Sequence, residues 1–307
     1  VAMMAYVTAV FGQNYPEKPI RVYAPQAGTS VDLVLRLVAE AVSVSLGQRM
    51  LVENRGILAP EIVARAQPDG YSLVCYTNPF WLMPLFRDNV SWDPVKDFSP
   101  ISLTVRQPNL VVVHPSVPAK SIKELIALAK AKPGELNYGS TSTGNANHVA
   151  AELFKAMAGV SVVRINYKGG AQAVSDLVAG QVHLSFSSAG ALMPYVKSGK
   201  LRALAVTSAQ PSPLVPGLPT VAAAGLPGYE STASTAVLAP AKTPTAIIRR
   251  LNHEIVQALH RSEVKERLLN LGIELVGSSP EQLAATIKAE MTTIGKVIKD
   301  FGLREKG

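Results

Sequence analysis

Short β-type runs alternate with helical patterns along most of this chain, and this alternation constrains the fold more than any other feature. Helical connections return the chain so that successive strands run in the same direction. The clearest helical pattern is the last one, in which apolar residues recur at steps of three and four. It consists of Leu283, Ile287, Met291, Ile294 and Ile298. The sequence therefore predicts α/β domains with mixed, mostly parallel sheets.

The β-type runs are rich in Val, Ile, Leu and Tyr and are bounded by polar residues, Gly or Pro. Helices are expected between them. The expected strands are residues 20–24, 50–53, 71–76, 101–105, 110–114, 136–138, 162–167, 182–186, 201–207, 235–238 and 273–276.

A length of 307 residues suits about two domains. Two segments, residues 107–109 and 231–244, look like strands that lead from one compact unit into another. We expect one lobe to contain residues 15–109 and 235–307, and a second lobe to contain residues 110–234. Such a double crossing makes a hinge with a cleft beneath it, and ligands bind at the carboxyl ends of strands in such clefts.

The charge distribution does not favour nucleic acid as a partner. Thirty Lys and Arg against 22 Asp and Glu give a net charge of +8, which also suits an anionic surface or anionic solutes. The basic residues are scattered, and no basic run is interleaved with aromatic residues that could stack on bases. The single cysteine, Cys75, lies in an apolar run and is expected to be buried.

Residues 1–14 are apolar and uncharged, and Val10 and Gly12 stand where a signal peptidase prefers small residues. This segment is expected to be the end of a signal peptide or, alternatively, an N-terminal arm. No later segment reaches the roughly 18 apolar residues that span a bilayer. We therefore expect a soluble protein of the periplasm.

Residues 136–150 (LNYGSTSTGNANHVA) combine a β-type run, a polar loop and the start of a helix. The free N–H groups of a first helical turn attract anions, and the loop adds hydroxyl and amide donors. This predicts a site that holds a carboxylate without a cation, although the same residues could simply cap the helix. The donors are Ser140, Thr141, Ser142, Asn145 and Asn147.

Gly139 and Gly144 have P-loop spacing, but Asn145 and Ala146 follow where Lys and Ser or Thr would stand, so nucleotide hydrolysis is not expected.

Four further groups of small or polar residues follow expected strands and should line the cleft. In the first lobe they are Ala27, Gly28, Thr29, Ser30 and Asp32, together with Thr77 and Asn78. In the second lobe they are Tyr167 and Gly169, then Ser187 and Ser188. Asp32 has two interpretations, because a first-turn acid can stabilise its own helix or contact a ligand or ordered water.

The sequence gives little support to catalysis. His148 can either pack and hydrogen-bond the loop or touch the ligand. His253 and Glu254 begin a possible zinc motif, but Gln257 stands where the second His is required. Neither G-x-S-x-G nor G-x-G-x-x-G occurs. We expect no enzyme activity, no metal and no cofactor.

From residue 15 to residue 303 the chain resembles the extracytoplasmic solute receptors of tripartite tricarboxylate transporters, the Bug or TctC family. The resemblance rests on WDPVKDFSPISL, HPSVPAKSIKELIALAKAKPGELNYGS, YKGGAQAVSDLVAGQV, GKLRALAVTS, PTVAAAGLPGYE and LAPAKTP, in the family's order. It implies a type II periplasmic-binding-protein fold whose two lobes close on a small carboxylated solute. It also implies that backbone amides, hydroxyls and ordered waters hold the carboxylates. The implied sites are Gly28, Thr29, Ser30 and Asp32 in one lobe, and Ser140, Asn145, Asn147 and His148, adjoined by Tyr167 and Gly169, in the other.

Three departures from the family pattern bear on the ligand. The segment after Arg55 is shorter than the family's glycine-rich loop, so that one cleft wall could be missing. Ser187 replaces a frequent acid, which makes contact with an ammonium group less expected. Pro79, Phe80 and Trp81 replace more polar residues and suggest either an aromatic or apolar-bodied carboxylate or core packing.

The expected function is that of a monomeric periplasmic receptor, which captures a mono- or dicarboxylate and presents it to the membrane permease of a tripartite transporter. Two alternatives stay open at this point. One is a sensory receptor for a signalling partner, and the other is a cleft enzyme that acts on a carboxylic acid.

Overall fold

A computed structural model describes residues 15–141, 144–300 and 304 of the chain, and the expected signal segment lies outside them. Strands and helices alternate as the sequence predicts. The first part forms β1 (Ile20–Ala24), α1 (Ser30–Leu46), β2 (Met50–Asn54), the 3-10 turn η1 (Gly56–Leu58), α2 (Ala59–Ala64), β3 (Ser72–Thr77), α3 (Pro79–Phe86) and β4 (Phe98–Val113).

The middle of the chain forms α4 (Ile122–Ala131), β5 (Asn137–Ser140), α5 (Ala146–Ala158), β6 (Val163–Asn166), α6 (Gly170–Val178), β7 (Leu184–Ser188), α7 (Ala189–Lys197) and β8 (Arg202–Val206). The chain then returns through β9 (Thr232–Pro240), α8 (Thr245–Leu259), α9 (Ser262–Asn270), β10 (Glu274–Leu275) and α10 (Pro280–Asp300).

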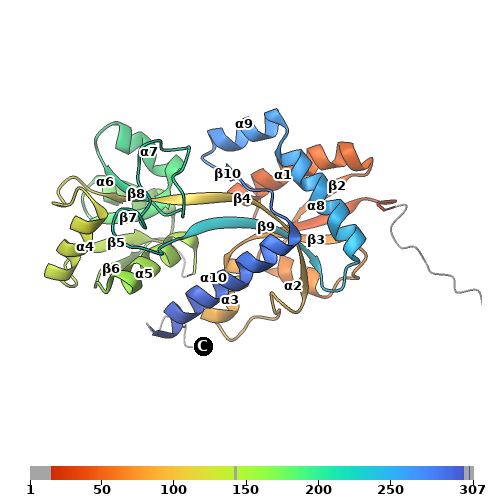
Figure 1. The fold of residues 1–307 in the computed structure, drawn as a ribbon, viewed down its shortest axis with the longest axis horizontal. Coiled ribbons are helices and arrows are strands. Elements are labelled where there is room, and N and C mark those ends of the chain that lie inside the picture. Colours follow the sequence, from red (N-terminus) through yellow and green to blue (C-terminus); the bar gives the residue numbers. More distant parts are fainter. Residues whose placement is uncertain (1–14, 142–143, 301–303, 305–307) are drawn as a thin grey trace, which may run out of the picture.

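These elements make two α/β lobes that lie side by side, with β4 and β9 running between them (Figure 1). In the first lobe, β1 pairs in parallel with β2 and β3, and β9 and β10 pair with β4 in the antiparallel direction. In the second lobe, β5 pairs in parallel with β6 and β7, and β4 is antiparallel to β7 and β8. This is the mixed-sheet, two-lobe architecture predicted from the sequence. Because β3 is also antiparallel to β9, the strand pairs are not mostly parallel, as had been expected.

The two strands expected at residues 101–105 and 110–114 are one continuous strand, β4, which includes the strand-like crossing segment predicted at residues 107–109. Residues Gln107 and Pro108 pair with Ala233 and Thr232 of β9. This pairing holds the crossing residues in an extended conformation. As a result, the two lobes are joined by paired strands rather than by a flexible linker.

The largest apolar cluster crosses from one lobe to the other. It contains Trp81 of α3 and Leu283 of α10 in the first lobe, and Tyr138 of β5 and Phe154 of α5 in the second. Separate clusters cover the opposite faces of the sheets, under α1 and α8 in the first lobe and under α6 and α7 in the second. Cys75 is buried in β3, as predicted, and this burial raises the pKa of its thiol to about 12.

Within the residues that the structure describes, no helix is both long and apolar enough to cross a membrane.

Candidate functional site

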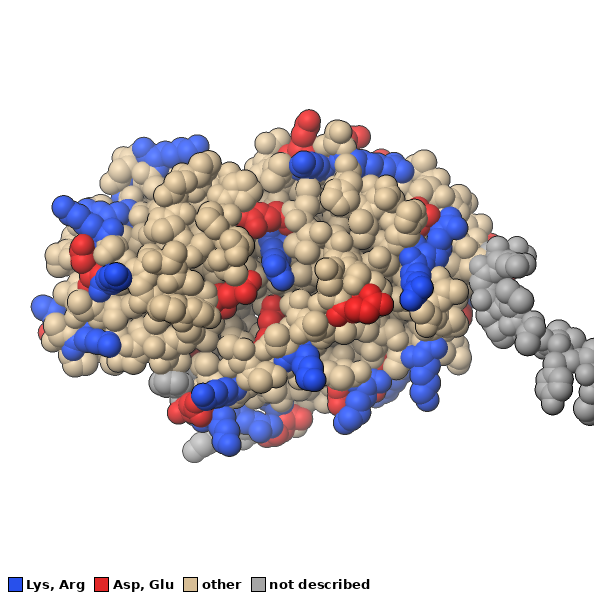
Figure 2. Space-filling model, in the orientation of Figure 1, with Lys and Arg blue, Asp and Glu red and all other residues tan. Residues whose placement is uncertain are grey.

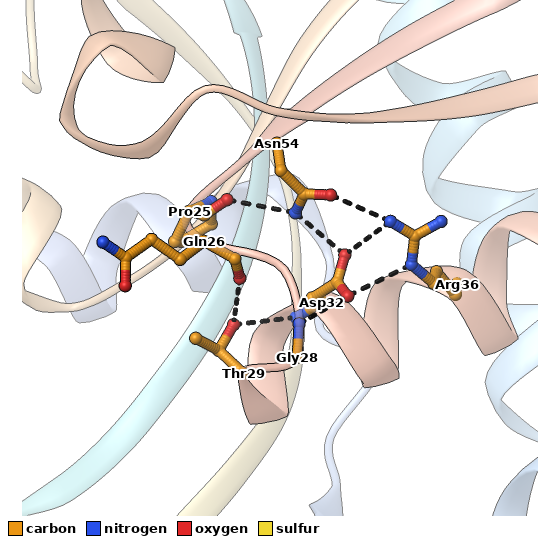
Figure 3. Close-up of polar contacts among 7 residues, drawn as sticks. All are labelled: Pro25, Gln26, Gly28, Thr29, Asp32, Arg36 and Asn54. Carbon is orange, nitrogen blue, oxygen red and sulfur yellow. Dashed lines mark hydrogen bonds and ion pairs between the residues drawn. The ribbon is translucent and has the colours of Figure 1, made fainter.

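The first-lobe loop, residues 25–32, folds around the carboxylate of Asp32 (Figure 3). The Asp32 side chain accepts hydrogen bonds from the Gly28 N–H at 3.0 Å, from Asn54 Nδ2 at 2.9 Å and from Arg36 Nε at 3.1 Å. Thr29 caps α1, because its hydroxyl oxygen accepts the Asp32 N–H at 3.3 Å. Of the two interpretations of Asp32, these contacts support the structural one.

Asp32 is ionised and almost enclosed, with 5% of its surface exposed. Burial alone would raise the pKa of this carboxyl. The hydrogen bonds from Arg36, Asn54 and Gly28 outweigh that effect and lower the pKa below its ordinary value. Asp32 therefore positions the loop, and its oxygens are already occupied by protein donors.

Gly28 has a left-handed backbone (φ 77°), which turns its N–H toward Asp32. Residues with a Cβ adopt this conformation at a cost, so glycine suits the position. The N–H groups of Ser30 and Val31 have no acceptor four residues earlier within α1, because the helix begins there. Ser30 lines a small cavity of about 20 Å³ with Thr77 and Gln107, so two predicted site residues are brought together. Ala27 lies in the same loop, beside Gly28.

In the second lobe, Asn145 caps α5 and stiffens the loop that precedes it. Its Oδ1 accepts the His148 N–H at 2.8 Å, and its Nδ2 donates to the Thr141 hydroxyl oxygen. The Nδ1 atom of His148, in turn, accepts the Gly144 N–H at 3.1 Å, and the ring is buried. His148 thus holds the loop together, as in the first of its two interpretations.

A guanidinium group, which the prediction of a loop without a cation did not include, lies beside this loop. Arg164 Nε donates to the Ser140 hydroxyl oxygen at 2.7 Å, and Nη2 donates to the Thr141 carbonyl and, at 3.3 Å, to Asn166 Oδ1. Sequence reasoning missed Arg164 because the contact depends on register. The pairing of β5 with β6 sets Arg164 opposite Tyr138, two residues before Ser140. The sequence offered one sign of this contact: Arg164 and Asn166 are two residues apart on an expected strand, so both side chains lie on the same face of it.

The other predicted second-lobe residues surround the same strand ends. The Tyr167 N–H donates to the Ser140 carbonyl at 2.8 Å, and its ring packs so closely that a Cβ on Gly139 would lie 3.1 Å from a ring carbon. Asn147 Nδ2 reaches the Ser187 hydroxyl at 3.5 Å. Gly169 is the residue before α6, and Ser188 is the residue before α7 and pairs with Asn109 of β4.

The structure separates Thr77 from Asn78, although they are neighbours in the sequence. Asn78 Nδ2 donates to the Thr232 carbonyl at 2.9 Å, and its side chain lines a different cavity. Phe80 and Trp81 are fully buried, and Phe80 stacks on Trp92 and packs edge-on against Phe98. These aromatic residues belong to the core, so they give no support to an aromatic ligand.

The shortened segment after Arg55 forms η1 and α2, and the Ala59 and Val63 side chains of α2 are buried. Among the described residues, no group of three or more His, Cys, Asp or Glu side chains could hold a metal ion.

The family model of the tripartite tricarboxylate transporter family receptor matches residues 34–303. Protein BugT of Bordetella pertussis is 31% identical over 313 residues, which cover 100% of this chain and 96% of BugT.

Two solved structures share the fold. Rpa4515 of R. palustris with adipate is 35% identical, with a TM-score of 0.77 and coverage of 94% of this chain and 98% of that one. MatC of Rhodopseudomonas palustris with bound malate is 28% identical, with a TM-score of 0.74 and coverage of 92% and 100%. The chain therefore belongs to the receptor family of tripartite tricarboxylate transporters, the TctC or Bug solute-binding proteins.

Proposed function

We propose that this protein is a periplasmic receptor that captures a small mono- or dicarboxylate between its lobes and presents it to a tripartite tricarboxylate-type permease. The observation that carries the proposal is the second-lobe loop between β5 and α5, where Ser140 and Thr141 meet the Arg164 guanidinium at the end of β5. Hydroxyl groups, a helix start and a cation all stabilise a carboxylate. Adipate and malate in the two related structures are ligands of this class.

In this proposal the lobes keep the predicted limits of residues 15–109 with 235–307, and residues 110–234. The first-lobe loop contributes the open N–H groups of Ser30 and Val31, held in place by Asp32. The second-lobe loop contributes the anion-binding donors. The ligand would favour the closed arrangement through its contacts to both lobes, and the permease would recognise that arrangement.

Replacing Ser140 with Ala is expected to weaken carboxylate binding by about 1–3 kcal/mol, the range for leaving a buried partner without its hydrogen bond. A thermal-shift screen of mono- and dicarboxylates would supply the ligand, and calorimetry would give the two dissociation constants. Ser198→Ala is the matched control, because that exposed hydroxyl only contacts the Tyr195 carbonyl at the end of α7. Equal affinity in Ser140→Ala and Ser198→Ala would rule out the proposed site.

Ligand binding is expected to draw the lobes together about the β4–β9 crossing. Small-angle scattering should therefore show a smaller radius of gyration at saturating ligand than in its absence. The Ser140→Ala variant at the same ligand concentration serves as the control. An unchanged radius of gyration for a ligand that calorimetry shows to be bound would contradict closure.

A further inference from the structure

The two faces of the β4–β9 crossing carry different cavities. Side chains alternate between the faces of a strand, so neighbouring residues of β4 point in opposite directions. Gln107 faces the small cavity that also contains Ser30 and Thr77. Arg106 faces a larger cavity of about 240 Å³ on the other side, together with Thr232 of β9. This second cavity is therefore separate from the small cavity that Ser30 lines.

Both lobes contribute walls to the second cavity. The first lobe contributes α3 and α10, and the second lobe contributes α5 and the segment that leads into β9. Figure 2 shows acidic and basic side chains where the two lobes meet on the face that carries α10. The apolar part of the wall includes Leu82, Val149, Leu153 and Ile294, and the polar part includes Asn78, Arg106, Glu230 and Glu290.

Two buried polar atoms on this wall have no partner in the protein. One is Oδ1 of Asn78, whose side chain is only 7% exposed and donates through Nδ2 to the Thr232 carbonyl. The other is Nε of Arg106. Leaving such groups unsatisfied is costly, and buried polar groups in proteins almost always have a partner. Two residues of the cavity wall, Asn78 and Arg106, thus carry one acceptor and one donor that the protein leaves unpaired.

The charges of the wall restrict what that occupant can be. Glu290 Oε2 accepts a hydrogen bond from Trp81 Nε1 at 2.9 Å. The charges of Glu230 and Arg106 also interact with the Glu290 carboxyl, the first raising and the second lowering its pKa. Burial raises the pKa of Glu290 to about 7, against the opposing effects of its hydrogen bonds and of Arg106. A simple carboxylate would pair with Arg106 but would face two acids and leave Asn78 Oδ1 without a donor. A simple amine would leave Arg106 without an acceptor.

We propose that this cavity is a second binding site, which takes a free α-amino acid with an apolar side chain. The carboxylate of the amino acid pairs with Arg106, and its ammonium group donates to Asn78 Oδ1 and to Glu290. Its side chain lies against Leu82, Leu153 and Ile294. Because the walls belong to both lobes, an occupant stabilises one lobe arrangement and is coupled to ligand binding in the cleft.

The test is calorimetry on the full chain with leucine, valine and methionine, and with two analogues of leucine that each lack one charged group. These are 4-methylpentanoate, which lacks the amine, and 3-methylbutylamine, which lacks the carboxylate. At least one of the amino acids is expected to bind in the millimolar range or more tightly. Each leucine analogue is expected to bind at least about tenfold more weakly than leucine, equal to about 1.4 kcal/mol.

Arg106→Gln and Glu290→Gln are expected to weaken amino-acid binding at least tenfold, and Gln107→Ala, on the opposite face of the same strand, is the matched control. Ser140→Ala should leave amino-acid binding in place. If wild-type protein binds none of the three amino acids, the cavity holds water only and the proposal is wrong. If Ser140→Ala removes amino-acid binding while both cavity variants keep it, the amino acid occupies the carboxylate site and the proposal is equally wrong.

Discussion

Replacing Asp32 with Ala is expected to lower the free energy of unfolding by about 1–3 kcal/mol, the range for leaving buried donors unsatisfied, and to weaken carboxylate binding. The substitution leaves the Gly28 N–H, Asn54 Nδ2 and the Arg36 guanidinium without their common acceptor. Urea denaturation at neutral pH measures the effect on stability. Glu263→Ala is the control, because Glu263 forms only an exposed ion pair with Arg267, and such pairs contribute little. A loss no larger than that of the control would contradict the role given to Asp32.

The same variant should also change how stability depends on pH. The pKa of Asp32 is lower in the folded protein than in the unfolded chain, so the unfolded state binds the proton more readily. The stabilisation is therefore complete above the unfolded pKa of about 4 and is lost as pH falls through the folded pKa. Urea midpoints measured from about pH 6 to about pH 2 should converge between the wild type and Asp32→Ala. A constant difference across this range would show that the carboxylate is not the origin of the effect.

Replacing Arg164 with Met is expected to weaken carboxylate binding by about 1.5–3 kcal/mol, the range for hydrogen bonds to charged groups. The guanidinium donates to the Ser140 hydroxyl oxygen and to the Thr141 carbonyl, so it holds the end of β5 and the start of the loop in place. It also adds positive charge beneath the loop.

Arg202→Met is the matched control for the Arg164 variant, and calorimetry with the same carboxylate compares the two. Arg202 belongs to the same lobe and donates to the Val117 and Ala119 carbonyls. This control separates a general loss of stability from a loss at the site. Equal affinities in the two variants would show that Arg164 does not contribute to carboxylate binding.

The sequence was sufficient for the α/β class and the order of elements, because alternating strand and helix patterns are local signals. It was not sufficient to show that the strands on either side of residues 107–109 are one strand, because that continuity depends on pairing with β9. Similarly, Arg164 reaches Ser140 only because β5 and β6 pair in one particular register.

Contacts between residues that are distant in the sequence also explain why Asp32 had two interpretations. Its decisive partner, Asn54, is 22 residues away in the chain. The position of the Asn78 side chain also depends on a distant partner, because it donates to the Thr232 carbonyl, 154 residues away in the chain.

The apolar cluster that crosses both lobes has a consequence for how the protein unfolds. Trp81 and Leu283 from one lobe share this cluster with Tyr138 and Phe154 from the other, and β4 adds residues in both, such as Leu103 and Val113. Unfolding either lobe alone would expose the apolar surface that the other lobe covers, at a cost of about 25 cal/mol for each Å². The two lobes should therefore melt as one cooperative unit.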